Sequence, residues 1–284
     1  EAGEEELALA HGALVWRGQA LARVDRGKSP LAPRLIADAT LDPVAAPQRK
    51  ALLATLDGWL ARFLAPLEPL RRVEAASRAE SGGPELRALL IRLVETGGVL
   101  ERAGSGLDRL DKAQRAALGR LGVRIGALDL FLPAMLRPAA LAAWRALARG
   151  DGGEPTQAHP VIALDATPPP PGYRRLGRQG LRADLAEKLL RDAHAARMNA
   201  GRNAFRVDPG KAVSMGLSQD NHARLLRLAG FQPLPPRRLP PGAAGPPAPQ
   251  VWRWRPPRRQ QAPVSRSGAA RTANAFAELA ELVR

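Results

Sequence analysis

Residues 150–172, GDGGEPTQAHPVIALDATPPPPG, constrain the fold more than any other stretch, because they end in four consecutive prolines. Proline fixes the backbone φ angle and has no N–H to donate, so such a run favours an extended polyproline II segment over a helix or a central strand. The glycines and other prolines of the stretch also disfavour regular structure. We therefore predict a linker over 151–172 that divides the 284-residue chain into two parts.

The two parts differ in charge. Residues 1–170 carry 22 basic and 20 acidic side chains, whereas residues 171–284 carry 21 basic and 7 acidic ones. Of the 43 basic residues in the chain, five are lysine and 38 are arginine, whose planar guanidinium makes forked contacts with phosphate. A GC-rich genome would explain arginine in place of lysine, but not the uneven distribution. RNA or DNA is therefore the expected partner of the second part.

The pattern of apolar residues predicts a mainly α protein. A short β-hairpin region is expected over 1–42, followed by an α-helical domain over 43–150. After the linker, a small basic helical module that resembles a helix-turn-helix is expected over 173–231. A Pro/Arg-rich tail with a short terminal helix completes the chain over 232–284.

The helices of the 43–150 region are predicted from leucines at helical spacing. The first is expected to start with Asp42 as its side-chain cap and to break at Pro66. Further helices are expected to begin at Pro84 and at Asp111. These helices would enclose a core built mainly from leucine, alanine and valine.

The most apolar stretch of the chain, residues 120–144, is predicted to be a core segment and not a membrane span. Only twelve residues separate Arg124 from Arg137, and Asp129 lies among them. A bilayer-spanning helix needs about 20 apolar residues. Two prolines inside the stretch also require a break between regular elements. We therefore expect no membrane partner.

The chain contains no cysteine, which excludes disulfides and thiolate metal sites and favours a reducing, cytoplasmic location. Its four histidines are scattered and show no metal-ligand spacing, so no metal site is predicted. The first residue is Glu1 and no secretion signal follows it. We expect the sequence to be a piece of a longer or processed polypeptide.

One stretch resembles a phosphate-binding loop without its structural context. ARVDRGKS, residues 22–29, fits the loose pattern that ends in Gly-Lys-Ser, but Pro30 and Pro33 follow at once and no helix is indicated. A phosphate-binding loop needs a helix N-terminus directly after it. We interpret Lys28 as part of a hairpin turn, and no catalytic residues or bound cofactor are predicted for this chain.

The basic module over 173–231 is predicted to begin with a helix over about 181–198. Glu187 and Arg191 are spaced as a surface ion pair on that helix. Residues 208–231 then indicate a helix, a turn and a second helix, with Ser218 as the cap of the second helix. The pair could place its second helix against a duplex or could be a simple packing unit.

Arginines of this module are the first candidates for nucleic-acid binding. Sequence-independent phosphate contacts are predicted for Arg174, Arg175, Arg178 and Arg182. On the second helix of the pair, the candidates are Arg224 and Arg227.

A further candidate is the stretch QVWRWRPPRR, residues 250–259, in which tryptophan and arginine alternate. In an extended β-strand the tryptophans lie on one side and the arginines on the other. Single-stranded nucleic acid could then stack its bases on the tryptophans and bind its phosphates to the arginines. The alternative is an edge strand whose tryptophans dock on the module. The residues concerned are Trp252, Arg253, Trp254, Arg255, Arg258 and Arg259.

Four blocks of sequence resemble one family, in order along the chain. They are LAPRLIADATLD (31–42), RLGVRIGALDLFLPAMLRPAA (120–140), GYRRLGRQGLRAD (172–184) and GLSQDNHARLLRLAGF (216–231). They look like the C-terminal region of bacterial, chiefly alphaproteobacterial, helicases similar to the RNA helicase of the mitochondrial degradosome, a DExH-type superfamily 2 motor.

The resemblance implies an accessory part of an ATP-dependent helicase. ATP and Mg²⁺ would bind in motor domains that lie upstream in the same polypeptide, and none of the family's catalytic motifs occurs in this sequence. The resemblance also implies RNA or DNA and the motor domains as partners, and it allows a nuclease as a third. The alternative is a non-enzymatic module that binds nucleic acid or docks a partner protein.

Overall fold

The computed structural model describes residues 7–25, 29, 31–79, 82–149, 159–165, 168–201, 203–235 and 249–255. Within these ranges 51% of the residues are helical and 22% lie in strands, which form four small antiparallel sheets. The prediction of a mainly α fold is therefore wrong, because the described chain is mixed α/β. Most of the missed strands have two to four residues, too few to show the alternation that identifies a strand in a sequence.

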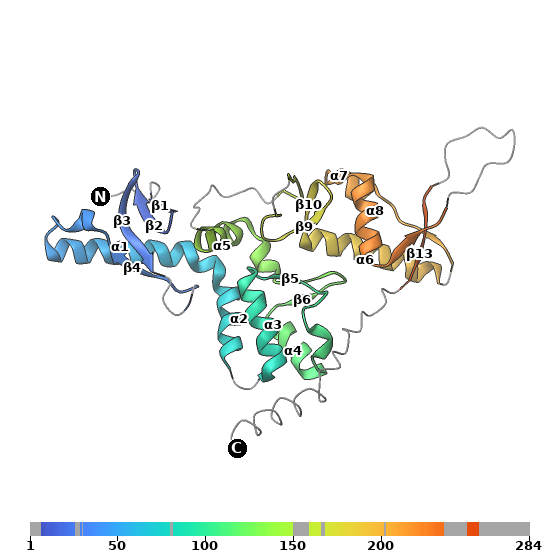
Figure 1. Ribbon diagram of the computed structural model, residues 1–284, viewed down its shortest axis with the longest axis horizontal. Helices are drawn as coiled ribbons and strands as arrows, with labels where there is room; N and C mark the ends of the chain where they lie inside the picture. The colour runs from blue at the N-terminus through green and yellow to red at the C-terminus, as the bar shows by residue number, and fades with distance from the viewer. Residues whose placement is uncertain are drawn as a thin grey trace, which may run out of the picture.

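The first sheet is an antiparallel meander in chain order, in which a tight turn joins each of the first strands to the next. His11-Gly12 and Arg17-Gly18 all have positive φ angles, between 48° and 80°, as hairpin turns of type I′ require. The sheet lies beside the first helix (Figure 1). Its strands are β1 (Leu7–Ala10), β2 (Ala13–Trp16), β3 (Gln19–Asp25) and β4 (Arg34–Ala37).

The expected helices are present between this sheet and residue 149, with one error at a boundary. The first helix starts at Ala46 without a side-chain cap, and Asp42 instead pairs with Arg49. Pro66 does end that helix, and Asp111 caps another by accepting from the amide of Gln114. The helices are α1 (Ala46–Leu64), α2 (Glu68–Arg78), α3 (Gly83–Glu95), α4 (Lys112–Arg120) and α5 (Pro138–Arg149).

The apolar stretch 120–144 is part of the core. It contributes two short strands, one 3-10 turn and most of α5, and Leu130 and Met135 are fully buried. Its strands β6 (Arg124–Ile125) and β7 (Asp129–Phe131) pair with β5 (Val99–Glu101), which follows α3. No helix in the described part of the chain is both long and apolar enough to cross a bilayer.

The second part of the chain contains two further sheets around one long helix. The module predicted as purely helical begins with a β-hairpin, and residues 251–254 form the middle strand of the last sheet. Ser218 caps its helix as expected, accepting from the amide of Asn221. The elements are β8 (Val161–Ala163), β9 (Tyr173–Leu176), β10 (Gln179–Arg182), α6 (Ala183–Ala200), β11 (Phe205–Arg206), α7 (Gly210–Ser214), α8 (Gln219–Leu228), β12 (Phe231–Pro233) and β13 (Val251–Trp254).

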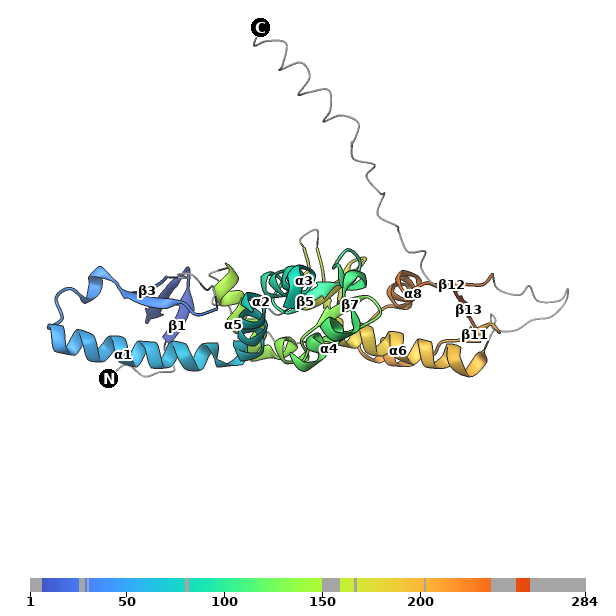
Figure 2. The ribbon, with the colours of Figure 1, turned by 90° about the horizontal axis from the view of Figure 1, so that it is seen from below.

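Two hydrophobic cores result, one drawn from residues 7–147 and one from residues 176–252. The molecule is elongated, with the first sheet at one end and the β11–β13–β12 sheet at the other (Figures 1 and 2). The two cores meet where the loop between β6 and β7 packs on α6, and Ala127 and Leu128 of that loop contact the second core. The expected domain boundaries stay a prediction.

Glu187 of α6 stabilises the contact between α6 and the loop that joins β6 to β7. Its carboxylate accepts hydrogen bonds from three consecutive backbone amides, those of Ala127 at 2.6 Å, Leu128 at 2.7 Å and Asp129 at 2.9 Å. The residue is 5% exposed, so the surface ion pair predicted with Arg191 is wrong. Helical spacing alone could not show that this face of α6 is covered by a loop 60 residues earlier in the chain.

Candidate nucleic-acid interface

Arg174 is engaged in a buried ion pair and does not face solvent as a free cation. Its Nη2 and Nε lie 2.6 and 2.9 Å from the two carboxylate oxygens of Asp129, and these side chains are 12% and 6% exposed. Burial alone would lower the pKa of Arg174, but hydrogen bonds and charge from Asp129 and Glu101 raise it. The side chain joins the β9–β10 hairpin to β7.

Arg182 is likewise held by a carboxylate of its own chain. Its Nε and Nη2 donate to the two oxygens of Asp184 at 2.7 and 3.0 Å. These hydrogen bonds raise the pKa of Arg182 against the opposing effect of burial. Two of the four arginines predicted to contact phosphate therefore already donate hydrogen bonds to both oxygens of a carboxylate in the same chain.

Three other arginines gather at the turn of the β9–β10 hairpin. Arg175 donates to the carbonyl oxygens of Gly177 at 3.5 Å and Asp165 at 3.0 Å. A side-chain carbon on Gly177 would lie 3.1 Å from Nη1 of Arg224, so α8 brings that guanidinium to the same turn. Arg178 and Arg224 are exposed, and neither pairs with a carboxylate of the described residues. Arg227, also on α8, is not part of this group; it lines a pocket between α8 and the residues before β13.

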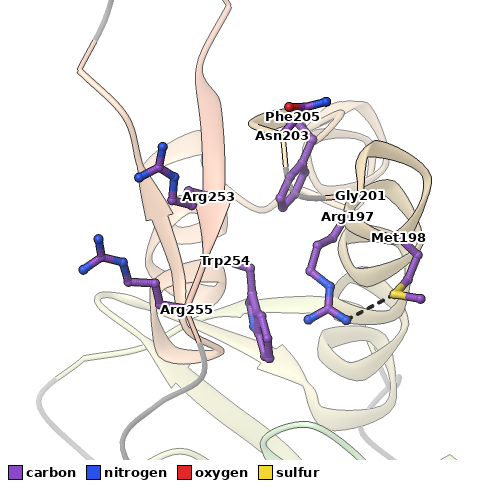
Figure 3. Close-up of a pocket in the computed structure, with 8 residues that line it drawn as sticks. All are labelled: Arg197, Met198, Gly201, Asn203, Phe205, Arg253, Trp254 and Arg255. Carbon is purple, nitrogen blue, oxygen red and sulfur yellow. Dashed lines mark hydrogen bonds between the residues drawn. The ribbon is translucent and has the colours of Figure 1, made fainter.

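Strand β13 shows the alternation that its sequence predicts. Trp252 is buried in the second core at 4% exposure, and Trp254 is half-buried. The indole N–H of Trp254 donates to the carbonyl oxygen of Ala229 at 3.1 Å. Arg253 and Arg255 are exposed and extend away from α6 (Figure 3). The tryptophans are thus docked on the module, and the arginines are the accessible side chains of this strand.

A pocket of about 590 Å³ lies between β13 and the end of α6 (Figure 3). The guanidinium of Arg197 lies over the ring of Trp254, 4.0 Å from its centroid. Asn203 and Phe205 form another side of the pocket. Every charged residue that lines it is an arginine, so the pocket favours an anion or a planar ring.

Arg197, Asn203 and Phe205 were not predicted as site residues. Only the closure of the β11–β13–β12 sheet brings them beside Trp254, and strands this short give no signal in the sequence. Arg258 and Arg259, predicted to extend the basic strand, lie outside the described residues. Lys28 and most of the surrounding glycine-lysine stretch lie outside them as well.

The two histidines of this part are positioned by packing. Burial lowers the pKa of His194, which packs against Phe231 and Trp254. Burial also lowers the pKa of His222, although the charge of Asp208 opposes it. Both imidazoles are therefore neutral near pH 7. The described residues contain no group of three or more potential metal ligands.

The family resemblance has no independent support from known proteins. No family model, no curated protein and no solved structure matches this chain. Two features of the second part of the chain indicate its function. They are an arginine-lined pocket at β13 and an arginine-rich hairpin turn on the same module.

Proposed function

We propose that this chain binds nucleic acid without sequence selectivity through its second part. The observation that carries the proposal is a set of four exposed arginines at the β9–β10 turn, on α8 and on β13. They have no carboxylate partner among the described residues and are Arg178, Arg224, Arg253 and Arg255. Free guanidinium groups bind phosphate whatever the base sequence. The two amide side chains at the hairpin turn, Gln179 and Asn221, are hydrogen-bonded to each other at 2.8 Å and are therefore not free as a pair to read a base.

Charge reversal of two of these arginines tests the proposal. We expect Arg253→Glu/Arg255→Glu to weaken binding of a single-stranded oligoribonucleotide by about tenfold at low salt and to flatten the dependence of affinity on salt concentration. Fluorescence anisotropy with the full chain measures both. The matched control is Arg87→Glu/Arg120→Glu, which reverses two exposed arginines of the first part.

The outcome that contradicts the proposal is an equal loss in the control, since the effect would then be one of net charge alone. Unchanged binding by Arg253→Glu/Arg255→Glu would contradict it as well. Neither substitution touches a buried side chain, so both variants are expected to fold, and circular dichroism checks this.

The wider role that we propose is that of an accessory C-terminal part of an ATP-dependent, cytoplasmic helicase acting on RNA. Support comes from the ordered sequence blocks, of which 120–140 is the most specific, and from the basic module that would hold the strand. ATP and Mg²⁺ would bind to motor domains of the same polypeptide, and a nuclease is a possible further partner.

The mass of the native polypeptide tests this wider role. We expect an antibody raised to residues 120–144 to detect, in an extract of the source cells, a band several times heavier than the 30.3 kDa of this sequence. A single band at 30.3 kDa would contradict the helicase proposal. It would leave the nucleic-acid binding to be decided by the charge-reversal experiment.

A further inference from the structure

A second pocket, of about 680 Å³, lies on the same module but has a different lining. It is bounded by the end of β11, the loop that leads into α7, one side of α8 and the residues before and within β13. It shares no lining residue with the pocket of Figure 3. Its volume falls in the range of pockets that enclose small organic ligands.

The pocket is lined by a largely buried histidine. His222 is 4% exposed, and its imidazole makes no hydrogen bond with any described residue. The neutral imidazole offers one N–H donor and one acceptor to whatever occupies the pocket.

Charged groups of both signs line the same pocket as this imidazole. Arg206 of β11 and Arg227 of α8 are exposed and have no carboxylate partner in the described part of the chain. Asp208 already accepts from the amide of Gly210 at 2.9 Å. Asp220, in the first turn of α8, is the remaining carboxylate of the lining. The guanidinium groups are thus free for an anion, while a carboxylate is available for an amino or hydroxyl group.

The other walls are apolar. Val207, Pro209 and Ala223 line the pocket, as does Trp252. A ligand that suits the whole lining has an anionic group, a flat apolar face and a polar edge. Inorganic phosphate alone would leave the apolar walls and His222 without contacts.

We propose that this pocket binds a mononucleotide. The phosphate lies at Arg206 and Arg227, the base packs on the apolar wall, and the polar edge of the base meets His222. This site is separate from the proposed strand-binding arginines at β13 and does not rest on them.

Isothermal titration calorimetry of the full chain with adenosine 5′-monophosphate tests the inference, and adenosine and inorganic phosphate serve as comparison probes. We expect saturable binding of the nucleotide, at least about tenfold tighter than that of either probe, because each probe satisfies only part of the lining. No saturable binding of the nucleotide would overturn the proposal. Phosphate binding as tight as the nucleotide would also overturn it.

Two matched variants locate the site. Arg227→Ala is expected to weaken nucleotide binding by about tenfold, whereas Arg191→Ala, at an exposed arginine of α6 outside the pocket, should leave it unchanged. Equal effects of the two variants would overturn the assignment. Both side chains are exposed, so both variants are expected to fold.

Mononucleotide binding in this pocket is independent of the proposed binding of single-stranded nucleic acid by the exposed arginines. The Arg253→Glu/Arg255→Glu variant should still bind the mononucleotide, because neither residue lines this pocket. Failure of the pocket proposal would therefore leave the oligoribonucleotide measurement intact, and the reverse also holds.

Discussion

Glu187→Ala is expected to destabilise the folded protein by about 3 kcal/mol. The carboxylate accepts from three consecutive amides, and its removal leaves these N–H groups without a partner at a junction that is largely closed to water. Urea denaturation followed by circular dichroism measures the loss. Asp192→Ala is the matched control on the same helix, where an exposed ion pair with Lys211 predicts a loss below about 1 kcal/mol.

Gly126 provides a second test of the same contact. A side-chain carbon at this position would overlap the carboxyl group of Glu187, so Gly126→Ala should displace the carboxylate and cost a similar free energy. The two substitutions remove one interaction, and their effects should therefore not add in the double variant. Full additivity would show that the carboxylate does not depend on the close approach of this glycine.

Arg174→Ala is expected to cost about 3–5 kcal/mol of folding free energy, because it leaves the carboxylate of Asp129 buried without its counter-charge. The side chain also donates to the carbonyl oxygen of Leu128 at 3.2 Å, and that contact is lost as well. Urea denaturation again gives the value. Arg175→Ala, the exposed neighbour in the same strand, is the control and should change stability little.

The double variant Arg174→Met/Asp129→Leu separates the cost of an unpaired buried carboxylate from the loss of the interactions that Arg174 makes. Replacing both charges with apolar side chains removes the uncompensated carboxylate, so the double variant should be more stable than Arg174→Ala. If it were less stable, the unpaired carboxylate of Asp129 would not be the main cost of Arg174→Ala.

The sequence predicted the elements with strong local signals. Asp111, Ser218 and Pro66 marked helix ends where the structure has them, because a cap or a proline acts within a few residues. The start of α1 was misplaced, since Asp42 has the chemistry of a cap but pairs with Arg49 instead.

The candidate site was harder to predict, because its parts are distant in the chain. Arg174 and Arg178 look alike in sequence. Only the fold shows that Arg174 pairs with Asp129, whereas Arg178 has no carboxylate partner among the described residues. The β11–β13–β12 sheet joins residues 205 and 252, and this pairing brings Arg197 to the ring of Trp254. Strands this short carry no periodic signal that would reveal such pairing.

The carboxylate of Glu187 also determines how the molecule would respond to a pulling force. The first sheet and the β11–β13–β12 sheet lie at opposite ends (Figure 1), so tension along the long axis loads the junction that the contact between α6 and residues 127–129 shares with the Arg174–Asp129 ion pair. Three N–H groups share one acceptor residue there, and hydrogen bonds weaken steeply with distance. A short displacement would break all three together, so this connection would be stiff under small loads and would give way abruptly under larger ones.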